Sequence, residues 1–282
     1  MLSQQSVLPR RTAVLGAGTI GEAMLSGLLR AGADPADLVF CERYDARAAQ
    51  VQERTGVERM LEPAKAVLFG DVLLLAVKPQ DLPALLDEIA AGVTTSHLVV
   101  SVAAGISTET IQAHLPAGTP VVRVMPNTAV LVDEGMSAVA GGSCATEQHL
   151  QQVEAVMGSV GRVVRVPEQQ IDAVTALSGS GPAYLYLLAE AMIDAGVLLG
   201  LPRSLATELT AQTVVGAARM LRDTGEHPAQ LREAVTSPGG TTAAALRVLD
   251  ERGMRAAVLG AVEAAQQRAT ALAGPAGTGR PR

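Results

Sequence analysis

The stretch Thr12–Gly21 reads Thr-Ala-Val-Leu-Gly-Ala-Gly-Thr-Ile-Gly, and it decides the fold of the first half of the chain. Its apolar run predicts a strand, and a helical pattern follows it. Between the two, Gly16, Gly18 and Gly21 have the spacing G-x-G-x-x-G. In such a turn the first glycine permits a tight bend, the second lets the backbone approach a pyrophosphate, and the third lets the helix pack on the strand. The stretch therefore predicts a dinucleotide-binding Rossmann turn; the alternative is an ordinary strand-to-helix turn of another α/β domain.

Strand and helix patterns alternate through the rest of this half, which is typical of a parallel sheet covered by helices on both faces. The expected strands are Ala13–Leu15, Leu38–Cys41, Val72–Val77, Leu98–Val102 and Val121–Met125. The pattern then ends with a strand Met136–Ala140, a helix Glu147–Met157 and a strand Arg162–Val166. Residues 12–166 are therefore expected to form a Rossmann-type domain that binds its ligand beyond the carboxyl ends of the strands.

Charged side chains follow two of these expected strands. Glu42 and Arg43 come directly after the second strand, where an acidic residue would bind the ribose 2′-hydroxyl of adenosine and an arginine would favour a 2′-phosphate. The two signals contradict each other, and either side chain could be a solvated loop charge. Lys78 ends a very apolar run and could lie near a cofactor, but Pro79 also marks a plain turn and helix start.

Composition indicates an enzyme-like globular protein with a core of small side chains. The 282 residues suit two domains, and 48% of them are hydrophobic but only 2% aromatic, so Ala, Val and Leu must form the core. A net charge of −6 without a basic tract disfavours nucleic acid as a partner. Cys41 and Cys144 have neither the pattern of a disulfide scaffold nor the spacing of a metal site, which fits a reducing cytoplasm and predicts no metal.

The second half has a different character. After Pro167, the residues up to Ala273 show helical periodicity and no strand pattern, so residues 167–273 are expected to form an all-helical domain. Residues 1–11 lack the apolar segment of a signal peptide and are expected to be a disordered leader. The Gly- and Pro-rich residues 274–282 are expected to be a disordered tail.

Two helices of this second half are apolar on nearly all sides. The stretch Ala183–Leu199 has Glu190 and Asp194 as its only charges, and Leu205–Leu221 is rich in alanine on several faces. Charges at mid-depth are costly in lipid, so a membrane span is not expected. A helix that is hydrophobic all round must be buried all round, and a small helical domain cannot bury two of them. Helices of a second subunit would cover them, as would packing against the first domain.

The loop Ser237–Thr242, with the sequence Ser-Pro-Gly-Gly-Thr-Thr, is the second informative stretch. Pro238 ends one helix, and Thr241 or Thr242 begins another that runs to about Arg252. Free N–H groups at such a helix start make an anion site suited to a carboxylate. An ordinary helix capped by threonine explains the residues equally well.

Seven motifs in this order resemble pyrroline-5-carboxylate reductase and cover residues from about 12 to 272. They are Gly16-Ala-Gly-Thr-Ile-Gly21, Val77-Lys-Pro79, Val102-Ala-Ala-Gly105, Met125-Pro-Asn-Thr128, Leu177-Ser-Gly-Ser-Gly-Pro-Ala-Tyr184, Gly225-Glu-His-Pro228 and Ser237-Pro-Gly-Gly-Thr-Thr242. The resemblance implies reduction of the cyclic imine 1-pyrroline-5-carboxylate to L-proline with NADPH or NADH, the last step of proline synthesis. It also implies a Rossmann domain followed by an all-helical dimerisation domain that interlocks with a second subunit, and dimers that often assemble into rings.

The resemblance also implies roles for individual residues. Ser237, Gly240 and Thr241 would hold the substrate carboxylate, and Thr242 would hydrogen-bond the ring nitrogen as the catalytic residue. The residues that would line the cofactor are Gly16, Gly18, Thr19, Ile20, Gly21, Val77, Lys78, Pro79, Ala103, Ala104 and Asn127. Family members that favour NADPH often have a small polar residue before the arginine, where this chain has Glu42, so Glu42 and Arg43 leave the choice between NADPH and NADH open.

The chemistry of the residues agrees with an imine substrate. Reduction of a ketone leaves an alkoxide that needs a proton donor, but the expected helical domain has no lysine, and neither Tyr184 nor Tyr186 has a lysine four residues later. A protonated imine gives an amine directly and mainly needs orientation. The alternatives are a hydroxyacid dehydrogenase, which would need a helix-borne lysine in the second domain, and a cofactor-binding regulator without catalysis.

Overall fold

The computed structural model describes residues 11–273, so the expected tail and all of the expected leader except Arg11 lie outside the described residues. The described chain forms two compact units, residues 11–180 with 265–273, and residues 181–264. The first unit holds the sheet, and the second consists of helices. The division follows Ser180 rather than position 166, and the last helix, α12 (Met254–Ala273), contributes residues to both units.

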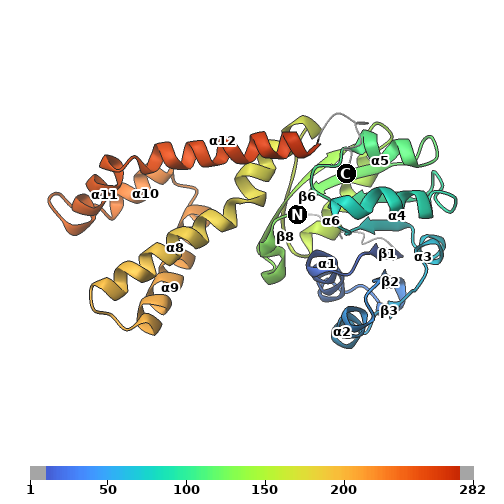
Figure 1. Ribbon diagram of the computed structural model, residues 1–282, viewed down its shortest axis with the longest axis horizontal. Coiled ribbons are helices and arrows are strands. Elements are labelled where there is room, and N and C mark those ends of the chain that lie inside the picture. Colours follow the sequence, from blue (N-terminus) through green and yellow to red (C-terminus); the bar gives the residue numbers. More distant parts are fainter. Residues whose placement is uncertain (1–10, 274–282) are drawn as a thin grey trace, which may run out of the picture. The chain divides into compact units, whose positions relative to one another are not determined.

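The first unit is built on one eight-stranded sheet in the order β3-β2-β1-β4-β5-β6-β7-β8 (Figure 1). The strands are β1 (Thr12–Leu15), β2 (Leu38–Cys41), β3 (Glu58–Arg59), β4 (Val72–Leu75), β5 (Leu98–Ser101), β6 (Val121–Met125), β7 (Gly135–Gly141) and β8 (Gly161–Arg165). Neighbouring strands are parallel except β6 and β7, which are antiparallel. The order, with β1 between β2 and β4, is that of a Rossmann sheet, which confirms the expected α/β class.

Helices cover both faces of this sheet. On one face α1 (Thr19–Arg30), α2 (Asp45–Thr55) and α6 (Glu147–Gly158) enclose a core that includes Val14. On the other face α3 (Pro63–Phe69), α4 (Leu82–Ile89) and α5 (Thr108–His114) enclose a second core that includes Ala13 and Leu15. Successive residues of β1 thus serve opposite faces, as the two-residue period of a strand requires. Burial on both faces explains why these strands are continuous apolar runs.

The strand β3 and the direction of β7 differ from the expected elements. The strand β3 has only two residues and no apolar run, so no sequence pattern signalled it. The strand β7 pairs antiparallel with β6 because only nine residues, including a 3-10 helix Thr128–Val132, separate the two strands. A parallel connection needs a crossover of about a dozen residues or more.

The turn between β1 and α1 brings strand and helix into direct contact. Gly16 has a positive φ of 98°, and its N–H donates to the carbonyl of Cys41 at 2.9 Å, which ties the turn to the end of β2. A Cβ on Gly21 would lie 2.1 Å from the Gly16 carbonyl oxygen, so only glycine permits this approach. A Cβ on Gly18 would meet no atom within 4 Å. The bend at Gly16 and the close packing at Gly21 agree with the roles that the sequence predicted for these two glycines.

The second unit consists of α8 (Gly181–Leu198), α9 (Arg203–Asp223), α10 (Pro228–Ala234), α11 (Thr241–Glu251) and the first part of α12. The helices α8 and α9 pack through small residues, since a Cβ on Gly196 would lie 3.0 Å from that of Ala206. Asp194 and Arg203 join the same two helices by an ion pair at 2.8 Å. No residue of α8 is buried within the single chain. Among residues 11–273, no helix is long and apolar enough to cross a membrane.

A buried arginine connects the sheet to the segment that leads to α8. Arg123 on β6 is 5% exposed at its side chain and forms ion pairs with Glu168 at 3.4 Å and Asp172 at 3.8 Å. Glu168 also accepts a hydrogen bond from the Thr108 N–H at 2.7 Å, and Asp172 accepts one from Thr270 of α12 at 3.0 Å. Buried charges require such partners. Within the first unit, the cluster therefore ties the segment before α8 and the end of α12 to β6.

We predict that alanine at Gly21 and alanine at Gly18 differ sharply in their effect on stability. Gly21→Ala forces helix and strand apart and should lower the free energy of unfolding by about 3 kcal/mol or more, the upper range for overpacked sites. Gly18→Ala has open space and should cost about 1 kcal/mol or less, as expected for alanine at a helix N-cap. Urea denaturation of both variants measures the difference, and equal losses would contradict the close contact at Gly21.

Candidate functional site

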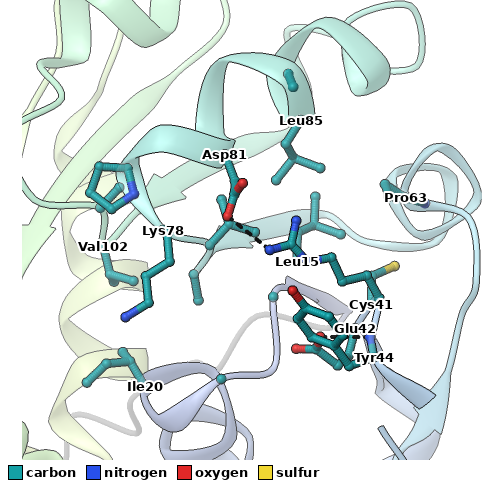
Figure 2. Close-up of a pocket in the computed structure, with 18 of the residues that line it drawn as sticks. Leu15, Ile20, Cys41, Glu42, Tyr44, Pro63, Lys78, Asp81, Leu85 and Val102 are labelled. Carbon is teal, nitrogen blue, oxygen red and sulfur yellow. Dashed lines mark hydrogen bonds and ion pairs between the residues drawn. The ribbon is translucent and has the colours of Figure 1, made fainter. Parts of the chain in front are cut away.

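The main cavity of the first unit lies at the carboxyl ends of β1, β2, β4 and β5, where the glycine turn begins α1 (Figure 2). Its volume is about 1010 Å³, enough for an extended dinucleotide. All the expected cofactor residues except Gly21 and Asn127 line it. They are Gly16, Gly18, Thr19, Ile20, Glu42, Arg43, Val77, Lys78, Pro79, Ala103 and Ala104. Residues from four loops far apart in the sequence thus meet at one cavity.

The sheet ladder explains why these loops meet. The N–H of Ala76 donates to the Leu15 carbonyl at 2.8 Å, and the N–H of Val102 donates to the Leu75 carbonyl at 3.1 Å. These are the last hydrogen bonds between β1, β4 and β5, so the three strands end side by side at the same edge of the sheet. The strand β4 stops at Leu75, so Val77 and Lys78 leave the sheet and border the cavity, although the apolar run predicted a longer strand.

The carboxylate of Glu42 is held by backbone groups. One oxygen accepts the N–H of Ala17 at 3.3 Å, and the other accepts the N–H of Tyr44 at 3.1 Å. Arg47 of α2 holds the other side of the same turn, because its Nε donates to the Ala17 carbonyl at 2.9 Å. The middle of the glycine turn is therefore fixed from both sides by α2 and the β2 loop.

Arg43 has a different environment. Its guanidinium forms an ion pair with Asp81 at 3.5 Å and lies 4.8 Å from the centre of the Tyr44 ring. The carboxylate of Asp81, followed by the Tyr44 hydroxyl, raises the pKa of Arg43 above its ordinary value. Asp81 belongs to the 3-10 helix Pro79–Asp81 after β4, so the ion pair joins two strand ends; it is the dashed line that reaches Asp81 in Figure 2.

Lys78 and Cys41 contribute different chemistry to the cavity wall. The turn expected at Pro79 is present as the 3-10 helix Pro79–Asp81, with Lys78 as its N-cap residue. The Lys78 side chain makes no capping bond to this helix, and Lys78 borders the cavity. Burial, with a smaller contribution from Glu88, raises the pKa of the Cys41 thiol to about 12. The thiol is therefore neutral near pH 7 and is a poor nucleophile.

Two expected cofactor residues have structural contacts instead of a place on the wall. Gly21 packs against Gly16 as described above. The side-chain oxygen of Asn127 accepts the N–H groups of Ala129 at 3.2 Å and Met136 at 3.1 Å, and its amide nitrogen donates to the Ser178 carbonyl at 3.3 Å. Asn127 thereby joins the end of β6 to a π-helical turn, Thr175–Gly179, in the Ser-Gly-Ser-Gly motif.

The cavity wall also contains Tyr44, Arg47 and Asp81, which were not singled out from the sequence. Tyr44 and Asp81 lie within three residues of charged strand ends that were, so proximity to Arg43 and Lys78 was an available signal. Arg47 lies in the first turn of α2, and no sequence pattern indicated its place near the glycine turn.

The loop Ser237–Thr242 lies in the second unit. Gly239 has a positive φ of 68°, and the N–H of Gly240 donates to the Ser237 carbonyl at 3.0 Å. The helix α11 begins at Thr241, and its N-cap, Gly240, provides no side-chain capping bond. Threonine therefore does not cap this helix. Within residues 11–273 the Thr242 hydroxyl has no hydrogen-bond partner, and the N–H groups of the first turn are free.

Comparison with known proteins identifies the family. Residues 168–272 match the model for pyrroline-5-carboxylate reductase dimerisation, and residues 11–105 match the model for coenzyme F420-dependent NADP oxidoreductases. The pyrroline-5-carboxylate reductase of Mycobacterium tuberculosis is 46% identical over 285 residues, covering 93% of this chain and 96% of the relative.

Two solved structures extend this likeness to the fold. A pyrroline-5-carboxylate reductase from Coxiella burnetii has a TM-score of 0.88 and 36% identity, covering 94% of this chain and 98% of the other. The Plasmodium falciparum pyrroline carboxylate reductase, solved with NADP bound, has a TM-score of 0.84 and 29% identity with the same coverage. The family models, the sequence relatives and the folds agree along both halves, and the chain belongs to the pyrroline-5-carboxylate reductase family.

Proposed function

We propose that this protein reduces 1-pyrroline-5-carboxylate to L-proline with NADPH, the last step of proline synthesis, and that NADH can replace NADPH. Membership of the family along nearly the whole chain carries the proposal. The NADP bound to the Plasmodium falciparum relative supports the choice of NADPH as the main cofactor.

The first unit would hold the cofactor. The free N–H groups at the start of α1 suit a pyrophosphate, and the open space over Gly18 lets its oxygens approach the backbone. The loops after β4 and β5, with Lys78 and Ala103, would border the rest of the dinucleotide. When bound, the reduced nicotinamide supplies a hydride.

The loop Ser237–Thr242 would hold the substrate. The helix start at Thr241, the backbone of Gly240 and the hydroxyl of Ser237 offer donors to the carboxylate. The unpartnered hydroxyl of Thr242 is available to the ring nitrogen. A Cβ on Gly240 would lie 2.5 Å from the Ser237 Oγ and 3.2 Å from the Ser237 carbonyl oxygen, so a side chain at Gly240 would displace the Ser237 hydroxyl.

These groups suffice for an imine. Hydride adds to the carbon of the protonated C=N bond, and the π electrons of that bond pass to nitrogen as its lone pair, so the product amine is neutral without a further acid. The protein then has to orient the ring and exclude water, and correct orientation can lower a barrier by up to about 7–11 kcal/mol. A loop of glycine, serine and threonine is adequate for this task, and no lysine is needed.

An assay with pyrroline-5-carboxylate and NADPH tests the function directly. We expect oxidation of NADPH that depends on the substrate, together with formation of L-proline. Binding of the dinucleotide without turnover would contradict the proposal and favour the cofactor-binding regulator. Turnover of 2-hydroxy or 2-oxo acids in place of the imine would favour the dehydrogenase alternative.

Thr242→Val should impair the reaction and leave the fold intact. Loss of a hydrogen bond that orients the imine should lower kcat/KM about 10- to 100-fold, equivalent to about 1.4–2.7 kcal/mol. Because Gly240 and not threonine caps α11, the melting temperature should change little. Steady-state kinetics and thermal unfolding measure the two effects.

Thr241→Val is the matched control, since it removes the neighbouring hydroxyl from the same helical turn while keeping the backbone N–H groups proposed to hold the carboxylate. We expect its kcat/KM to change much less. Equal kinetic losses in both variants, or near-normal turnover of Thr242→Val with a lowered melting temperature, would contradict the assigned role of Thr242.

The dimerisation match over residues 168–272 indicates a homo-oligomer, and we propose that its basic form is an obligate dimer. Large apolar side chains of α8 are exposed in the single chain, including Leu187 at 68% and Leu198 at 88%. We predict an interface of well over about 2,000 Å², the range of permanent complexes. Sedimentation at low micromolar concentration should detect no folded monomer, and a stable monomer with native helix content would refute the prediction.

The proposal extends to a ring of dimers and to a cytoplasmic location. A second apolar surface on α11 and α12, lined by Leu246, Leu249, Met254, Val258 and Leu259, supports further assembly. The same sedimentation experiment measures it as a mass several times that of the dimer. Free Cys41 and Cys144 are compatible with a reducing compartment.

A further inference from the structure

The charges around the main cavity differ in how firmly they are held. Three cationic side chains line it, Arg43, Arg47 and Lys78, and three carboxylates line it as well, those of Glu42, Asp81 and Glu88. Glu42 accepts two backbone N–H groups, and Arg47 binds both the Ala17 carbonyl and Glu22. These two side chains fix the glycine turn.

The pair of Arg43 and Asp81 is held loosely. Its N–O distance of 3.5 Å exceeds the roughly 2.7–2.9 Å of a charge-assisted hydrogen bond. The Arg43 side chain is 64% exposed and that of Asp81 35% exposed, so water reaches both. The Tyr44 ring, 4.8 Å from the guanidinium, supports Arg43 from another side. Arg43 can therefore change partner without disturbing the glycine turn.

The ion pair of Arg43 and Asp81 lies where the adenosine ribose of a dinucleotide is expected. Arg43 follows β2, where the adenosine ribose lies in Rossmann sites, and Asp81 reaches it from the loop after β4 (Figure 2). A 2′-phosphate at that ribose would be drawn to Arg43. A dinucleotide with a free 2′-hydroxyl would leave the pair intact.

We propose that Asp81 is a specificity-determining residue that competes with the 2′-phosphate of the cofactor for Arg43. The inference rests on the proposed function, in which NADPH and NADH both serve. To bind the phosphorylated cofactor, Arg43 must leave Asp81, whose carboxylate then remains unpaired beside a phosphate of charge about −1.5 to −2. Asp81 thus weakens binding of NADP(H), leaves that of NAD(H) unchanged and brings the two affinities closer together.

The test compares Asp81→Asn with the wild-type full-length protein by calorimetric titration with NADP+ and with NAD+. We expect the Kd for NADP+ to fall about 3- to 10-fold, the range set by an exposed ion pair plus the repulsion that is removed. The Kd for NAD+ should change less than about twofold. The side chain of Asp81 makes no capping bond to α4, so the variant should fold normally.

Two further variants test whether the effect of Asp81 depends on its position and on Arg43. Asp87→Asn removes the same charge from α4, at a side chain that is 69% exposed, pairs with His114 and does not line the cavity; its affinities should match the wild type. In an Arg43→Ala background, Asp81→Asn should tighten NADP+ binding clearly less than it does in the wild type, because no arginine is left to release and only the repulsion between carboxylate and phosphate is removed.

Two outcomes would overturn the role proposed for Asp81. An equal change in the Kd values for NADP+ and NAD+, or no change in either, would show that Asp81 does not determine cofactor specificity. An undiminished effect in the Arg43→Ala background would mean direct repulsion instead of competition for Arg43. If the protein bound both dinucleotides but did not reduce pyrroline-5-carboxylate, the proposed function would fail while the binding comparison would still decide the role of Asp81.

Discussion

The close contact between α1 and β1 at the glycine turn is the constraint on which the site depends. Without side chains at Gly16 and Gly21, the first turn of α1 lies against the end of β1, and its free N–H groups point beyond the sheet. The neighbouring strands then secure the turn: the Gly16 N–H binds the Cys41 carbonyl of β2, and a Cβ on Gly16 would lie 2.9 Å from Ala76 after β4. Because β1 lies between β2 and β4, one turn organises three strand ends into a single cavity.

Much of this fold could be predicted because burial on both faces makes a strand visible in the sequence. The strands β1, β2, β4 and β5 are buried at every residue, and each appears as an apolar run. The strand β3 has no such run, since it is a short edge strand of Glu58 and Arg59 that only its pairing with β2 defines. The direction of β7 could not be predicted from its own residue pattern either, because it follows from the short connection between β6 and β7.

The site was predictable in position but not in detail. Glycine spacing and strand ends located the cavity, since both are consequences of backbone geometry. The charges were ambiguous because a sequence does not show which partner a side chain chooses. Glu42 and Arg43 are adjacent yet differ completely: Glu42 binds backbone N–H groups, whereas Arg43 reaches the neighbouring loop. The sequence likewise does not show the partners of Asn127, whose side-chain amide bonds the backbone of β7 and of the π-helical turn.

The helical half shows why assembly is built into the sequence. The two charged residues of α8, Glu190 and Asp194, are four residues apart. Asp194 forms an ion pair with Arg203 on α9, within the helical hairpin of α8 and α9. The remaining length of α8 is apolar and exposed in the single chain, and exposed apolar area costs roughly 25 cal/mol per Å² relative to burial. Small residues such as Gly196 and Ala206 let α8 and α9 approach closely, but they bury little area in doing so. A core of small side chains therefore stabilises the hairpin only weakly, and the larger leucines on its outside must find their burial against another subunit.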